Sequence, residues 1–130
     1  MNTWVRIAAV LILSLSFSAS LIAEEEGVFT PDAARGAAIF GAICVHCHLI
    51  SYEESRMGAP GLKGVLERYD AKWLDQWIKS PEAFAKKDET AADLLGSNKH
   101  GLKMPTFPAM QNDQKRADII EYLKTLKGDE

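Results

Sequence analysis

Apolar side chains recur at helical spacing in three stretches of the chain, and this pattern predicts three main helices. Each stretch follows a residue whose side chain commonly caps a helix, and in the first stretch Pro31 would then occupy the first helical position. Proline and glycine end the second and third stretches. We expect helices that run from Thr30 toward Cys44, from Asp70 to Ser80-Pro81, and from Asn112 to a stop at Gly128.

The segments between these helices are predicted to be loops with short helical turns. Glycines together with Pro60 indicate a loop over residues 51–64. The polar stretch 82–101 contains one helical turn, Thr90–Leu95, which the following glycine would end. Residues 101–105 predict an extended loop. No alternating pattern long enough for a strand is present, so we expect a single all-α domain.

The N-terminus has the layout of a secretory signal peptide. A positive charge precedes the apolar run 7–17, which small residues follow. That run is shorter than the roughly 20 residues that a membrane-spanning helix needs. We expect residues 1–23 to be removed by cleavage after Ala23, with Ser20 as a second candidate site and an uncleaved membrane anchor as the other interpretation. Residues 24–130 would then form the mature domain, exported to the periplasm.

The net charge of the chain argues against one class of partner. The full chain carries a formal net charge of −3, and removal of Arg6 with the signal peptide leaves −4. Proteins that bind nucleic acid normally carry a basic excess, so we do not expect a nucleic-acid partner. No acid–base pair stands out from the helix faces, and we do not expect the chain to be an enzyme.

The two cysteines of the chain belong to one short motif, Cys44-Val45-His46-Cys47-His48. C-x-x-C-H is the sequence to which c-type haem is attached. Cysteines three positions apart at a helix end lie on the same side of the chain, where both sulfurs can bond to one haem. The histidine that follows is then placed to bind the iron as an axial ligand. We therefore predict one covalent haem c, bound through Cys44 and Cys47, with its iron on His48.

Three other uses of the cysteine pair fit the sequence less well. A disulfide across two intervening residues would constrain very little of the chain. A thioredoxin-like redox pair needs a strand followed by a helix, and the all-α pattern lacks one. A zinc site would need four ligands, for which His100 would have to join Cys44, Cys47 and His48, but structural zinc sites have ligands in two spaced pairs.

The second axial ligand is less strongly indicated by the sequence. A methionine thioether is a usual partner of histidine in haem electron carriers. The candidates are Met57, Met104 and Met110, with His100 as a histidine alternative. Met104 is favoured because it lies in a loop beside the rigid Pro105, beyond the first two predicted helices. Met57 is close in sequence to His48, and a lone methionine such as Met110 is commonly core filler.

With these motifs in place, residues 30–127 resemble the class I c-type cytochromes, which are small all-α proteins with three main helices around one covalent haem. The resemblance implies that the Pro60 carbonyl accepts the ring N–H of His48, and that Trp77 lines the haem pocket near the axial methionine. The motifs that carry the resemblance are Gly36 with Phe40, Cys44 to His48, Gly58 to Leu62, Trp73 to Pro81, Lys103 to Pro105, and Glu121 to Leu123.

The resemblance also implies that Gly36 and Phe40 pack across Tyr122 and so join the first and last helices. The function it implies is one-electron transfer between a donor and an acceptor protein that dock weakly and briefly. A membrane would be a partner only if the signal segment stays uncleaved. Two alternatives remain open at this point: a cytochrome subunit of a periplasmic redox enzyme, and a haem protein that binds or senses a gas.

Overall fold

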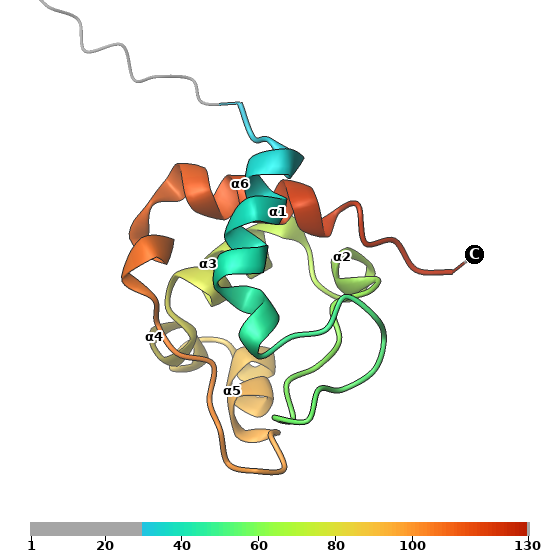
Figure 1. Cartoon of the computed structure of the whole chain (residues 1–130). Coiled ribbons are helices and arrows are strands. Elements are labelled where there is room, and N and C mark those ends of the chain that lie inside the picture. The colour runs from blue at the N-terminus through green and yellow to red at the C-terminus, as the bar shows by residue number, and fades with distance from the viewer. Residues whose placement is uncertain (1–29, 130) are drawn as a thin grey trace, which may run out of the picture.

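Two helices from opposite ends of the described chain cross in the core (Figure 1). The structure is a computed structural model and describes residues 30–129, so the predicted signal peptide lies outside the described residues. The crossing helices are α1 (Ala33–Ala42) and α6 (Asp113–Leu123). Between them in sequence lie the 3₁₀ turn η1 (Cys44–His46), α2 (Val65–Arg68), α3 (Ala71–Lys79), α4 (Pro81–Ala85), α5 (Glu89–Gly96) and the 3₁₀ turn η2 (Pro108–Gln111).

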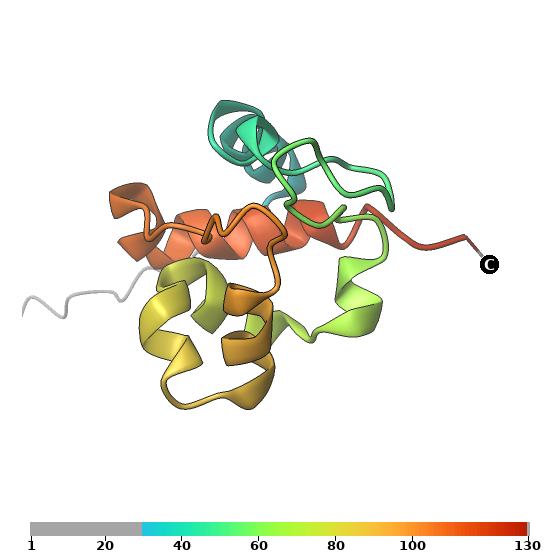
Figure 2. The same cartoon turned by 90° about the horizontal axis from the view of Figure 1, so that it is seen from below.

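The described residues consist of helices and loops without a strand, which confirms the all-α prediction. Figure 2 shows two groups of elements on opposite sides of the molecule: α3, α4 and α5 on one side, and α1 with the loop that follows it on the other. The described residues include no helix of the length and apolar character required to cross a membrane.

Close packing of α1 on α6 depends on a glycine. A Cβ atom on Gly36 would lie 1.9 Å from the backbone oxygen of Asp118 and 2.8 Å from Cβ of Tyr122. The backbones can therefore approach only because residue 36 has no side chain. One turn along, the rings of Phe40 and Tyr122 pack with their centroids 5.3 Å apart. The predicted contact between the first and last helices is confirmed.

The N-terminus of α1 is fixed by Asp32 rather than by Thr30, which corrects the predicted cap. The Asp32 carboxylate accepts the backbone N–H of Arg35 at 2.7 Å, and Pro31 precedes the helix. The backbone N–H of Asp32 donates in turn to the buried carboxylate of Asp118 on α6. A contact between distant parts of the sequence thus selects one of two suitable caps.

Caps at the other helices follow the sequence more closely. Asp70 caps α3 and Asn112 caps α6, as predicted. Ser80 ends α3, but Pro81 at once begins α4, because proline suits the first position of a helix. The predicted turn over Thr90–Leu95 is the longer α5, capped by Asp88 and extending through the glycine that was expected to stop it.

Helix α6 ends at Leu123, five residues before the predicted stop at Gly128. The tail instead bonds to the segment around α2. The backbone N–H of Gly64 donates to the carbonyl of Leu126, and the N–H of Gly128 donates to Glu67 at 2.7 Å. These bonds, one to a backbone carbonyl and one to a side-chain carboxylate, take the place of further helical turns.

Candidate cofactor site

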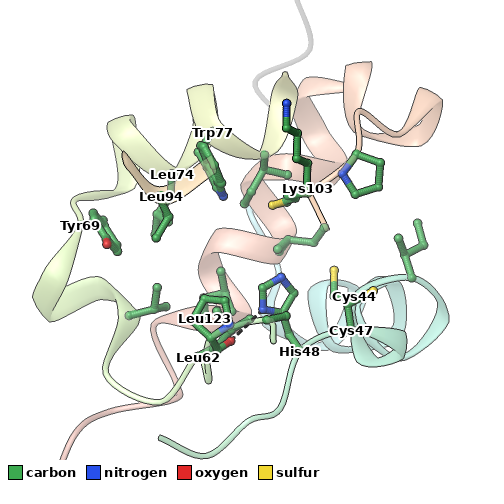
Figure 3. Close-up of a pocket in the computed structure, with 18 of the residues that line it drawn as sticks. Cys44, Cys47, His48, Leu62, Tyr69, Leu74, Trp77, Leu94, Lys103 and Leu123 are labelled. Carbon is green, nitrogen blue, oxygen red and sulfur yellow. Dashed lines mark hydrogen bonds between the residues drawn. The ribbon is translucent and has the colours of Figure 1, made fainter. Parts of the chain in front are cut away.

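A cavity of about 380 Å³ lies between the two groups of elements (Figure 3). Its size falls within the range of about 300–1,000 Å³ that is usual for cofactor and ligand pockets. Most of its lining side chains are apolar or aromatic, and they come from every named element except α4 and from the loops between them. The long loops and short helices therefore surround a space that the protein's own side chains do not fill.

Cys44, Cys47 and His48 form one wall of this cavity. The cysteines lie in and just after η1, which follows directly on α1. The backbone N–H groups of Cys47 and His48 both donate to the carbonyl of Cys44, at 3.1 Å and 2.9 Å. This tight turn brings the two side chains next to each other, and Figure 3 shows the His48 ring reaching from the same wall into the cavity. Both cysteines are free thiols.

A hydrogen bond to the backbone of Pro60 fixes the orientation of the His48 ring. Its Nδ1 lies 2.8 Å from the carbonyl oxygen of Pro60, the hydrogen bond that the resemblance implied. Because a carbonyl only accepts, Nδ1 carries the proton and Nε2 keeps a free lone pair. Burial lowers the pKa of His48, although the bond to Pro60 works in the opposite direction. At neutral pH the ring is thus the neutral, oriented imidazole that a metal binds.

The Cys44 thiol lacks the lowered pKa of a cysteine in a redox-active pair. Burial, followed by the nearby Cys47, raises the pKa of Cys44 to about 11. Catalytic C-x-x-C cysteines have lowered pKa values, because the thiolate is the reactive form. The absence of strands among residues 30–129 also removes the strand–helix context of a thioredoxin-like site.

The zinc interpretation fails for a geometric reason. His100 is exposed and lies outside the lining of the cavity that the other three candidate ligands share. Within residues 30–129, no group of three or more cysteine, histidine, aspartate or glutamate side chains is arranged to hold a metal ion. His100 is for the same reason a poor candidate for a second axial ligand.

Met104 lines the cavity from another direction. It is partly buried against the core and belongs to the extended segment between α5 and η2. Figure 3 shows its neighbour Lys103 across the cavity from His48. Met57 and Met110 also line the cavity, but Met57 is 42% exposed, and Met110, 1% exposed, belongs to the packed core. Met104 differs from both because it is partly buried in the cavity wall without being part of the core itself.

An aromatic wall closes the side formed by α3. Tyr69, Trp73 and Trp77 stack in sequence, with ring centroids 4.4 Å and 5.6 Å apart and planes 18° apart in both pairs. All three line the cavity. Trp77 is almost fully buried, and Figure 3 shows its ring reaching into the cavity from α3. Trp77 thus lies in the cavity wall, and its contact with a haem stays a prediction.

The sequence did not single out several residues that the structure brings to this cavity. Leu94 on α5 is one of them, and the short stretch of α5 gave no sign of which face would be buried. Asn98 is another. A single asparagine in a polar stretch carries no pattern, so only the fold reveals its position.

The residues present fit a haem. The cavity is large and mainly apolar, as a porphyrin requires, and one wall offers two adjacent free thiols beside a histidine with an available ring nitrogen. The comparisons with known proteins agree. The sequence model of the family described as cytochrome c matches residues 33–127. This chain belongs to the cytochrome c family.

This cytochrome covers most of the length of several relatives. Cytochrome c2 of Rhodopila globiformis is 32% identical over 106 residues, covering 74% of this chain and 94% of the relative. Cytochrome c2 iso-1 of Rhodospirillum centenum is 27% identical over 124 residues, covering 75% and 98%. Cytochrome c of the plant Guizotia abyssinica is 31% identical over 99 residues, covering 72% and 88%.

A solved structure supports the same fold for this cytochrome. The cytochrome c domain of the pp3183 protein from Pseudomonas putida has a TM-score of 0.56 and 33% sequence identity, covering 69% of this chain and 85% of that one. Family membership implies a covalently bound haem with its iron, and the two cysteines at positions 44 and 47 are consistent with that attachment.

Proposed function

We propose that this cytochrome is an exported one-electron carrier whose haem is attached through Cys44 and Cys47 and whose iron is held by His48 and Met104. The proposal rests on one observation above all: the oriented His48 imidazole and the Met104 thioether line the same apolar cavity. When bound, the haem iron supplies a centre that gains or loses a single electron.

The chain's own residues have three tasks in this function. His48, oriented by Pro60, offers a neutral nitrogen in a fixed direction. Met104 would be the second protein ligand of the iron, which would leave no site for a substrate. The aromatic and aliphatic walls, Trp77 among them, exclude water and lower the local dielectric. An electron carrier of this kind needs no acid–base chemistry, and we propose no enzymatic activity.

The partners are proposed to be a donor and an acceptor redox protein that dock weakly, as rapid turnover requires. The location is proposed to be the periplasm. The signal-like residues 1–23 support it. So does the similarity to bacterial proteins named cytochrome c2.

The attachment can be tested by mass measurement of protein made in a host with haem-attachment machinery. The parent should carry one haem per chain, and the double variant Cys44→Ser/Cys47→Ser should carry no covalent haem. His46→Ala is the matched control, because His46 is exposed at a variable position between the cysteines; it should retain the haem. A parent without covalent haem would refute the proposal.

The carrier function can be tested on the same protein. Voltammetry should show a reversible one-electron couple, and the ferrous protein should not bind carbon monoxide at neutral pH because both axial positions are filled. Ready binding of carbon monoxide would instead favour the gas-binding alternative. Copurification with a larger partner from the native source would favour the subunit of a redox enzyme.

A further inference from the structure

Asn98 makes a contact that joins two loops far apart in sequence. Its Nδ2 donates to the carbonyl of Met57 at 2.9 Å, across 41 positions of the chain. Met57 belongs to the loop after His48, and Asn98 follows α5 on the way to Met104. Figure 1 shows the first of these loops approaching the end of α5 at the lower side of the molecule.

The same side chain organises the segment that leads to Met104. Asn98 Oδ1 accepts the backbone N–H of His100 at 2.8 Å and that of Leu102 at 3.2 Å. Leu102 lies two residues before Met104, so the carboxamide oxygen fixes the path of the chain just ahead of the methionine. A side chain with only one of the two functions, donor or acceptor, would satisfy only one of the two loops.

The loop that contains Met57 has a backbone conformation that allows this contact. The N–H of Gly58 donates to Ser55 O, and Ser55 N–H donates to Ala59 O, which together make a tight turn directly before Pro60. Gly58 has a positive φ of 76°, and a Cβ there would lie 2.8 Å from Asn98 Nδ2. Glycine is required both by the backbone and by the closeness of Asn98.

Pro60 orients His48, and the segment after Asn98 carries Met104. We propose that Asn98 is a positioning residue that holds these two segments together and so keeps the Met104 thioether on the iron. A nearby ion pair, Lys99 with Glu54, joins the same loops, but both partners are substantially exposed and such pairs contribute little. The inference rests on the proposed His48–Met104 ligation.

The test measures how readily an added ligand displaces the thioether. Ferric parent protein and variants are titrated with imidazole at one neutral pH, and the weak long-wavelength absorption band of the iron–methionine bond is followed. Asn98→Ala removes the three side-chain hydrogen bonds and should tighten the apparent imidazole dissociation constant by about tenfold, since each bond contributes on the order of a several-fold change. Asn98→Asp keeps the acceptor and loses the donor, and should tighten it by about threefold.

One further variant separates positioning from general loosening of these loops. Ser97→Ala is the control, since Ser97 Oγ donates only to Leu94 O in its own turn; its imidazole affinity should remain within about twofold of the parent.

The outcomes distinguish this inference from the ligation on which it rests. A parent without the band would overturn the ligation and this inference with it. A parent with the band and an unchanged imidazole affinity in Asn98→Ala would overturn the role of Asn98 alone. An equal shift in Ser97→Ala would also overturn it, because the effect would then come from the end of α5 rather than from the contact between loops.

Discussion

At the scale of single residues, the fold is held by two buried charged side chains. Asp118 is 2% exposed and accepts hydrogen bonds from Asp32 N–H, from the Arg35 guanidinium and from Gln114. Arg116, on the same helix, donates to Asp75 on α3 and to the carbonyl of Met110. Because each charge has several partners, burial does not leave an unpaired ion. Together they fix α6 to α1, α3 and η2.

Asp118 gives the protein a specific response to acid. The hydrogen bonds from Arg35, opposed in part by burial, lower the pKa of Asp118 to about 2. A lowered pKa means that the stabilisation is present above the ordinary carboxylate pKa of about 4 and is lost as the pH falls toward about 2. Asp118→Asn should lower the free energy of unfolding by about 2 kcal/mol near neutral pH.

The measurement is urea unfolding at several pH values, on parent and variant. The difference in the free energy of unfolding between parent and variant should decrease as the pH falls from about 4 to about 2. Asp93→Asn, which alters an exposed carboxylate on α5, is the control and should follow the parent throughout. A difference in the free energy of unfolding that stays constant down to the lowest pH would contradict the role assigned to the Asp118 charge.

At the scale of helices, the crossing of α1 and α6 depends on the missing side chain at Gly36. Gly36→Ala should destabilise the protein by about 3 kcal/mol, because the Cβ meets backbone rather than a side chain that can move. Gly41→Ala is a matched control on the same helix, where a Cβ has open space around it. It should be neutral or stabilising by up to about 1 kcal/mol, because alanine favours a helix more than glycine does.

Thermal or urea unfolding of the two glycine variants decides this point. If close packing determines the effect, Gly36→Ala should lose much of the free energy of unfolding while Gly41→Ala loses none or gains some. Equal changes in the two variants would show that helix propensity rather than close packing determines the effect, and the crossing would then tolerate a side chain at position 36.

Helices with a cap and an apolar face could be predicted from the sequence, and the others could not. Asp70 and Asn112 each precede such a face and cap α3 and α6 as predicted. The pattern predicts Thr30 as the cap of α1, whereas Asp32 caps it, because nothing local in the sequence reveals the bond from Asp32 to Asp118. Helices of four or five residues, such as α2 and α4, are too short to show a period. The position of α2 follows from the tail and the cavity that it packs against, and that of α4 from its packing on α3 and α5.

At the scale of the whole molecule, the chain surrounds a cavity that one short motif anticipates. The motif predicted the haem and its first ligand because covalent attachment requires a fixed local spacing. The second ligand comes from a distant segment, so the sequence could only rank the candidates. Contacts between loops, such as the one from Asn98 to Met57, leave no local pattern and emerged only with the fold.

The most direct test of the account is the absorption spectrum of the ferric protein in the region of the iron–methionine band. The parent and Met57→Ala, which removes the exposed methionine of the cavity wall, should show the band. Met104→Ala should lose it while keeping its covalent haem. A parent that holds haem without the band, or a band that survives in Met104→Ala, would contradict the assignment of Met104 as the iron ligand.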